Sequence, residues 1–241
     1  MIRGNGAAKV LFSSILIFCA VFNLSAQDHE HGSYPQVIRG EVWIELEPIY
    51  GGYVDEEYPL DFLTASRRAL EEAAMIFSAM IYGWSFQYDI GERARQYSEV
   101  FELTPVAVIP FGDPGLRATD VEVRDMRVRL WTDYHLTESQ QRRMQVWRTG
   151  TVRNAQAVGY WLPGGLEART DWLTVKKTAL EDAARAAVRA MLQGSERNRP
   201  KEAQGFISLA SFPHYFIDSG RWAVSARFRV QITEIIPFAA Y

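Results

Sequence analysis

Two segments of this chain, residues 61–74 and 171–184, carry nearly the same sequence. Eight of the fourteen paired positions are identical, beginning with Asp61 and Asp171. In each segment apolar residues recur at spacings of three and four, which is the pattern of a helix with one apolar face. The repeat therefore predicts two similar amphipathic helices, over residues 62–82 and 172–193, and the other elements have to be arranged around them.

The first predicted helix has signals at both ends. The Asp61 carboxylate can accept hydrogen bonds from the free backbone N–H groups of the first turn, and Gly83 suits the left-handed residue that often follows a helix. Its apolar stripe consists of Leu63, Leu70, Ala73, Ala74, Phe77, Met80 and Ile81, and the second helix carries Leu173, Leu180, Ala183, Ala184, Ala187, Val188 and Met191. Alanine-rich stripes of this kind allow a helix to lie close against a sheet.

Strands are predicted on both sides of the helices. Over residues 37–47, Val42, Ile44 and Leu46 alternate with Glu41, Trp43, Glu45 and Glu47, which indicates a strand with one buried face. Further strands are predicted over residues 100–111, 121–131, 144–162, 206–216 and 222–233. The alternation slips by one residue at Arg124-Asp125, which indicates a β-bulge.

These elements predict an α+β fold made of two tandem βαββ repeats, each with one Ala-rich helix packed on an antiparallel sheet. The first repeat would cover residues 37–134 and the second residues 146–241, with residues 135–145 as the linker. The segment Arg127-Val128-Arg129-Leu130 resembles Arg227-Phe228-Arg229-Val230, which extends the internal likeness to the strand that closes each half.

The N-terminal residues 1–26 have the layout of a secretory signal peptide. Arg3 and Lys9 precede an apolar run over residues 10–24, which is short for a membrane span of about 20 residues, and Ser25-Ala26 offers a cleavage site. We therefore expect cleavage after Ala26, a flexible lead over residues 27–36, and a periplasmic or secreted protein. Alternatively, Cys19 is the acylated first residue of a lipoprotein.

Charge and composition restrict the partners. Cleavage after Ala26 removes 2 of the 26 basic residues and none of the 29 acidic ones, which leaves 24 against 29 and a net charge of −5. This balance argues against nucleic acid as a partner. No later apolar segment approaches membrane-spanning length. Because the single cysteine lies in the leader, the mature chain has no disulfide and depends on burial for its stability.

No strong catalytic signature is found. The chain lacks a Gly-x-Ser-x-Gly elbow, a phosphate-binding Gly-Lys-Ser/Thr loop and a His-Glu-x-x-His helix. We expect a protein that is not an enzyme, without catalytic, cofactor-binding or metal-ligating residues. One metal hypothesis is specific: a new N-terminus Gln27-Asp28-His29 could form the square-planar nitrogen set of Cu(II) or Ni(II), with His31 as an axial ligand. The alternative is a polar tail.

Three other groups of residues have both a functional and a structural interpretation. The acids Glu71-Glu72 and Glu181-Asp182 could be acid/base dyads, but we favour the solvent side of a helix first turn. The strand arginines could bind an acidic partner or lipid head groups, although we favour simple solvation with Glu41, Glu45 and Glu47 as cross-strand partners. The aromatic residues in predicted loops are candidates for a contact surface or, alternatively, for lids on the two small cores. The arginines are Arg124, Arg127, Arg129, Arg227 and Arg229, and the aromatic residues are Tyr50, Tyr53, Tyr58, Tyr160 and Trp161.

The order of strand, Ala-rich helix (residues 179–188) and two long strands resembles the N-terminal module of flagellar assembly protein T and related small secreted lipoproteins of diderm bacteria. The resemblance covers residues 37–134 and 146–236. It implies a non-enzymatic envelope or flagellar accessory protein that binds other envelope or flagellar proteins. Two alternatives remain: a periplasmic small-ligand or metal-binding protein, and a hydrolase using dispersed carboxylates. The hydrolase hypothesis predicts a deep cleft between the halves with clustered acids of shifted pKa. A buried constellation of His135, His214 and acids around a cavity would contradict a non-enzymatic protein.

Overall fold

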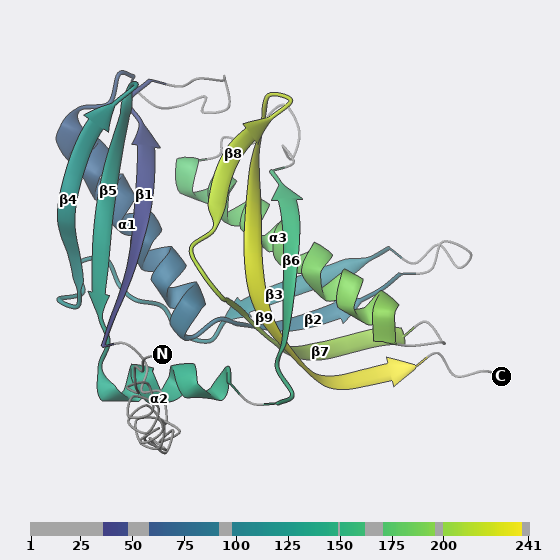
Figure 1. The fold of residues 1–241 in the computed structure, drawn as a ribbon. Helices are drawn as coiled ribbons and strands as arrows, with labels where there is room; N and C mark the ends of the chain where they lie inside the picture. The colour runs from purple at the N-terminus through teal and green to yellow at the C-terminus, as the bar shows by residue number, and fades with distance from the viewer. Residues whose placement is uncertain are drawn as a thin grey trace, which may run out of the picture. The chain divides into compact units, whose positions relative to one another are not determined.

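The computed structural model describes residues 36–47, 58–91, 98–148, 150–161, 171–195 and 200–237 of the chain. These residues all belong to one compact unit that runs from Tyr34 to Tyr241. The described elements are β1 (Val37–Glu45), α1 (Phe62–Ile81), β2 (Trp84–Asp89), β3 (Val100–Pro105), β4 (Leu116–Arg124), β5 (Arg127–His135), α2 (Glu138–Val146), β6 (Arg153–Tyr160), α3 (Trp172–Ser195), β7 (Pro200–Leu209), β8 (His214–Asp218) and β9 (Arg221–Pro237). The α+β class predicted from the sequence is confirmed, with antiparallel sheets (Figure 1).

The first sheet has three strands in the order β1-β5-β4, and α1 packs on β1 and β5. Asp61 is the N-cap of α1, as predicted: its Oδ1 accepts from Leu63 N at 2.9 Å and Thr64 N at 3.0 Å. The predicted inner face of β1 is also confirmed, since Val42 and Ile44 are buried. One residue of the predicted stripe was wrong, because Leu63 is 77% exposed.

The second sheet has six strands in the order β3-β2-β7-β9-β6, with β8 paired to β9 beside this path. Helix α3 packs on β6 and β9. The close approach expected of an alanine-rich helix is found here: a Cβ at Gly159 of β6 would lie 2.1 Å from Ala183 N and 2.3 Å from Ala179 O. The long strand predicted from the alternation over residues 222–233 lies within β9, which continues to Pro237.

Three findings differ from the expected arrangement. Strands β2 and β3 come from the first half of the chain but join the second sheet through β7, so the sheets do not divide between residues 134 and 146. The segment at 135–145 contains most of α2, and the strand predicted from residue 144 begins only at Arg153. The expected bulge at Arg124-Asp125 is instead a hairpin turn between β4 and β5.

The backbone geometry of the hairpin turn between β4 and β5 explains the slip in the alternation. Asp125 and Met126 have φ angles of 52° and 57°, so both occupy the left-handed region that a two-residue hairpin turn requires. Reversal of the chain between Arg124 and Arg127 changes which residues face inward, and in the sequence this looks like a slip in the alternation. Among the described helices, none has the length and apolar character needed to cross a membrane.

Candidate functional site

A buried ion pair joins the two amphipathic helices. Lys176 Nζ of α3 lies 2.5 Å from Glu72 Oε2 of α1, and the two side chains are 3% and 2% exposed. The ammonium also donates to the backbone carbonyl of Trp43 at 3.1 Å. It lies 4.9 Å from the ring centre of Trp43, 5.2 Å from that of Tyr215 and 5.3 Å from that of Trp222. Cation–π attraction from three rings therefore adds to the ionic contact, and α1, α3 and both sheets meet at this point.

Burial and charge act in opposite directions on Glu72. Removal of its carboxyl group from water raises the pKa of Glu72, and the Lys176 charge and hydrogen bond oppose that rise without cancelling it. The pKa of Tyr215 is raised well above its ordinary value, first by burial and then by the charge of Glu72. Because Glu72 is enclosed and engaged by Lys176, we interpret it as a structural acid.

Beside this pair lies a cavity of about 600 Å³, which we call the β1–β8 cleft. One wall is formed by residues 41–43 of β1 with Arg127 and Arg129 of β5, and the other by residues 213–217 in and before β8. Glu72 and Ile76 of α1 line it as well. Both β1 and β8 lie at sheet edges, so the cleft is bounded by two edge strands from different sheets. Its volume is that of typical ligand sites, which are about 300–1,000 Å³.

Two arginines give the cleft its charged wall. The Arg127 guanidinium lies 4.2 Å from the ring centre of Trp43, and its Nη2 is 3.8 Å from Glu45 Oε1. Arg129 Nη1 is 3.4 Å from Glu41 Oε1. The predicted cross-strand pairing of Glu41 and Glu45 with these arginines is therefore confirmed. The Nε atoms of both arginines are buried, but 29% of the Arg127 side chain and 35% of the Arg129 side chain are exposed, so part of each arginine is open to a ligand.

A second cavity of about 330 Å³ lies between α1, α3 and residues 105–111, and we call it the interhelical groove. Most of its lining is apolar, including Met75, Leu173 and Leu180. The lining hydroxyl of Ser78 donates to Ala74 O at 2.6 Å and accepts from Ile109 N at 2.8 Å. Its polar groups are thus satisfied within the protein, and the cavity suits an apolar ligand.

The predicted solvent-facing position of the paired acids is correct for only part of the set. Glu71 pairs with Arg67 at 3.1 Å, and Glu181 pairs with Lys177 at 3.8 Å. Burial raises the pKa of Glu181, and the Lys177 charge opposes that rise. Asp182 is part-buried and accepts from Tyr160 N at 2.9 Å. The prediction was wrong for Glu72, because this turn of α1 faces α3 and β1 and is not exposed to solvent.

The other arginines do not join the cleft. Arg124 is 68% exposed and pairs with Asp125 at 3.5 Å. Arg227 is exposed on β9, and Arg229 Nη2 donates to Ala210 O at 3.1 Å. In the aromatic group, Tyr160 donates to Asp218 Oδ2 at 3.3 Å, Tyr58 and Trp161 are part-buried, and Tyr50 and Tyr53 lie outside the described residues.

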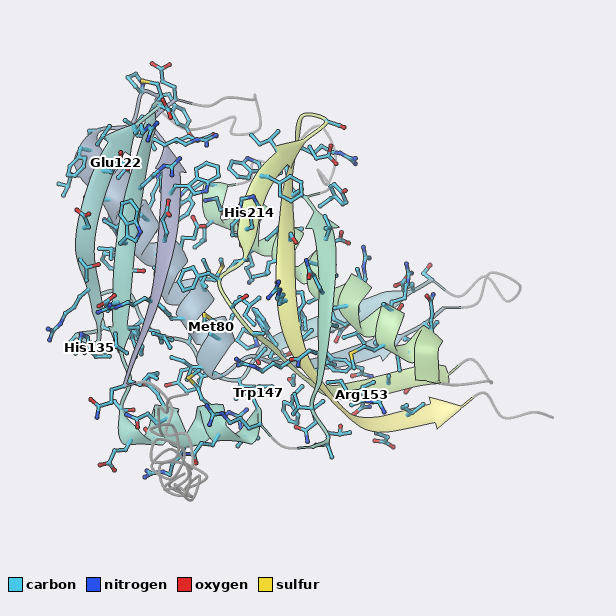
Figure 2. All side chains as sticks on the ribbon, in the orientation of Figure 1. Met80, Glu122, His135, Trp147, Arg153 and His214 are labelled. Carbon is cyan, nitrogen blue, oxygen red and sulfur yellow. The ribbon has the colours of Figure 1, made fainter. Side chains whose placement is uncertain are left out.

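The two described histidines are separated. Figure 2 shows His214 on β8 and His135 at the far end of β5, and only His214 lines the β1–β8 cleft. Within the described ranges no cluster of histidine, cysteine and acidic residues could hold a metal ion. Cys19 and the Gln27-Asp28-His29 segment lie outside the described residues, as do the predicted signal peptide and most of the predicted flexible lead.

Sequence reasoning missed the residues that build this site. Lys176 was given no role, and Trp43 was placed on the outer face of a strand, because local periodicity does not report contacts across the chain. The one signal available was the internal repeat: Lys176 is paired with Ser66 in the repeat, so a long cation replaces a small residue at one of the few positions where the segments differ.

The chain was compared with protein families, with other proteins and with solved structures. A protein-family model matches residues 25–238, a range that includes both sheets and the cleft between β1 and β8. The chain belongs to this family. An uncharacterized protein of Treponema pallidum (strain Nichols) is 24% identical over 200 residues, which cover 83% of this chain and 81% of that protein. No solved structure matches the chain.

Proposed function

We propose that this chain is an exported, non-enzymatic protein of the cell envelope that acts by binding another protein through the β1–β8 cleft. The observation that carries the proposal is the cleft itself, with the Arg127 guanidinium over the Trp43 ring and with both Arg127 and Arg129 partly exposed on its wall. Aromatic residues and arginine are the types enriched at binding hot spots. The leader-like residues 1–26 support export.

The acids of the cleft favour binding over hydrolysis. Glu41 contacts Arg129 at 3.4 Å, and Glu72 contacts Lys176 at 2.5 Å. Each carboxylate is thus associated with a cation of its own, whereas acid/base catalysis needs carboxyl groups that can exchange protons with a substrate. A partner in the flagellum or outer membrane is in keeping with the resemblance noted from the sequence.

The proposal is tested by blocking the cleft and asking which envelope proteins are lost. His214 is exposed and lines the cleft, so His214→Trp adds bulk at that wall. Tagged full-length chain, expressed in the native organism, is captured from the envelope fraction. We expect at least one protein captured by wild type to be lost with the His214→Trp variant.

The matched control is Arg227→Trp, which introduces the same ring on β9 at an exposed position away from the cleft. It should retain every partner that wild type captures. Identical partner sets for wild type and the His214→Trp variant would contradict binding through the cleft. N-terminal sequencing of the recovered chain tests export: it should begin at Gln27.

A second candidate function, binding of a small apolar ligand, is favoured by the interhelical groove. The groove is largely apolar and its volume of about 330 Å³ lies at the small end of the range for ligand sites. A single-chain alkyl ligand such as lauric acid should then raise the melting temperature of wild type in a saturable manner. Ala107→Trp, which fills the groove, should abolish that shift. Equal shifts in both proteins would reject this function.

We also propose that residues 37–134 and 146–241 are related βαββ units. The caps support this: Asp171 Oδ1 accepts from Leu173 N at 3.0 Å and Thr174 N at 2.9 Å, which repeats the pattern at Asp61. Each helix also packs on an antiparallel pair, β1/β5 or β6/β9. Family members in which the two units align more closely would support duplication, and members with unrelated helical segments would contradict it.

A further inference from the structure

We infer that the β1–β8 cleft binds an extended segment of a partner protein that carries acidic residues at alternate positions and adds to β1 as an antiparallel strand. This inference rests on the proposed function and specifies its partner. It follows from three features of the cleft: the open edge of β1, the spacing of the two arginines, and the apolar character of the remaining wall.

The edge of β1 that faces the cleft has backbone groups directed away from its own sheet. In an antiparallel pair, alternate residues exchange hydrogen bonds with the neighbouring strand and those between them point outward. Leu46 N donates to Met126 O at 2.8 Å, which assigns the even-numbered residues of β1 to β5. The backbone N–H and C=O groups of the odd-numbered Glu41 and Trp43 then point away from β5. The hydrogen bond from Lys176 Nζ to Trp43 O agrees with this direction. An added strand can therefore bond at Glu41.

The arginines have the spacing of a strand. Arg127 and Arg129 are two residues apart on β5, which places their attachment points about 6.7 Å apart on one face of the sheet. Acidic residues at positions i and i+2 of an extended peptide have the same spacing. Each peptide carboxylate can accept from the exposed part of one guanidinium, since 29% of the Arg127 side chain and 35% of the Arg129 side chain are accessible. The contact of 3.4 Å between Arg129 and Glu41 involves an acid that is 37% exposed, so a ligand can compete with it.

The opposite face of such a peptide meets apolar groups. Phe216 and Ile217 are half-buried and line the cleft, whereas Val42 and Ile76 also line it but are each only 2% exposed. Because successive side chains of a strand point to opposite faces, a peptide with acids at every second position would place its other residues against this lining. Main-chain bonds would supply affinity, and the alternating pattern would supply selectivity.

The opposite side of the cleft sets the length and direction. Residues 213–217 span about 13 Å in extended form, which corresponds to a segment of roughly four to five residues. Figure 1 shows β1 and β8 running in the same direction, so one inserted strand is antiparallel to both. Lys176 already occupies the carbonyl of Trp43, and the segment therefore ends beside that position.

The test uses the full mature chain and fluorescein-labelled hexapeptides, with binding followed by fluorescence anisotropy. The probe is an N-acetylated, C-amidated peptide of alternating glutamate and valine. The comparison peptides are alternating lysine and valine, a block peptide of three glutamates followed by three valines, and the alternating probe with every second amide N-methylated. Saturable binding is expected for the alternating acidic probe, with each comparison peptide weaker by about tenfold or more.

Protein variants locate the site. Arg127→Gln/Arg129→Gln should raise the dissociation constant of the acidic probe by about tenfold or more, since charge-assisted hydrogen bonds are lost. The matched control Arg124→Gln/Arg227→Gln makes the same change in net charge at exposed positions and should leave binding unchanged. Circular dichroism and melting temperature establish that both variants are folded.

Several results would overturn the inference. These are equal binding of the block or lysine peptides, no effect of Arg127→Gln/Arg129→Gln, and no binding of any probe. If glutarate displaces the probe and binds with the same dissociation constant as the probe, the cleft is assigned to small dicarboxylates instead. If no peptide binds but the His214→Trp variant still loses an envelope partner, the proposed function stands and the strand-addition inference fails.

Discussion

Glu72 and Lys176 lie 104 positions apart in the chain and form an ion pair in which neither side chain is more than 3% exposed. The contact joins α1 to α3, and the carbonyl of Trp43 ties the same ammonium to β1. Two charges out of water are stable only when they are paired and hydrogen-bonded. The relative position of the two helices therefore depends on this pair.

Removal of one partner should be far more harmful than removal of both. Glu72→Gln or Lys176→Met leaves one buried charge uncompensated and should lower the free energy of unfolding by about 3–5 kcal/mol. The double variant Glu72→Leu/Lys176→Met should recover most of that loss. Urea denaturation followed by circular dichroism measures all three. The control Lys177→Gln, at an exposed pair one residue away, should change stability by at most about 0.5 kcal/mol. Additive losses in the double variant would contradict this account.

The same pair predicts a pH dependence. Burial raises the pKa of Glu72 in the folded state above its ordinary value of 4.5, with Lys176 in opposition. The folded chain therefore binds this proton more tightly than the unfolded chain does, and stability falls as the pH rises from about 4.5 through the raised pKa. The unfolding free energies of wild type and the Glu72→Gln variant are measured from pH 4.5 to 7.5. As the pH rises, wild type should lose stability relative to the variant. A flat difference would mean that the pKa of Glu72 is the same in both states.

The helix caps should respond to pH with the opposite sign. At Asp171 burial acts to raise the pKa, but hydrogen bonds from the Thr174 side chain and from backbone N–H groups outweigh it and lower the pKa. Their stabilisation is present above the ordinary pKa of 3.8 and is lost as the pH falls through the lowered value. Asp171→Ala should reduce the unfolding free energy by about 0.5–2 kcal/mol at pH 7, measured by urea denaturation.

Asp61 gives an internal comparison for this prediction. Hydrogen bonds from Thr64 lower its pKa too, so Asp61→Ala should also destabilise the protein, and its effect should disappear at low pH. Asn at either position keeps the capping acceptor and should be tolerated better than Ala. Equal losses for Asn and Ala at neutral pH would show that the cap hydrogen bonds are not responsible.

Local signals in the sequence were sufficient for α1, for α3 and for the inner face of β1, whereas α2 lies in the segment that was expected to be a linker. The Asp61 cap and the Ala-rich stripes are set by residues within a few positions of each other, and their predictions were confirmed. The hairpin at Asp125-Met126 was missed because the second central position of that turn usually carries glycine, and Met126 occupies it here. The pairing of β2 with β7 was missed because strand partners far apart in sequence leave no local pattern.

The candidate site was harder to predict for a physical reason. Glu72 and Asp182 are equivalent in the internal repeat, yet Glu72 is 2% exposed and Asp182 is only part-buried. Their helical periodicity is the same, and what differs is the neighbouring chain: Lys176 and Trp43 cover Glu72. The proposed role of Arg127 and Arg129 likewise depends on β8, whose position opposite β1 follows from the tertiary fold.

The contact between β6 and α3 leads to a final prediction. A Cβ at Gly159 would lie within 2.6 Å of three backbone atoms of α3, and backbone cannot move aside as a flexible side chain can. Gly159→Ala should therefore push α3 away from the sheet and lower the unfolding free energy by about 1–3 kcal/mol or more.

Gly150→Ala is the matched control for this change, since a Cβ there meets no atom within 4 Å. Its stability should stay within about 0.5 kcal/mol of wild type or rise slightly, because alanine reduces the freedom of the unfolded chain. Displacement of α3 should also carry Lys176 away from Glu72. The Gly159→Ala variant should then lose most of its sensitivity to Lys176→Met, and fully additive effects of the two substitutions would show that β6 does not set the position of α3.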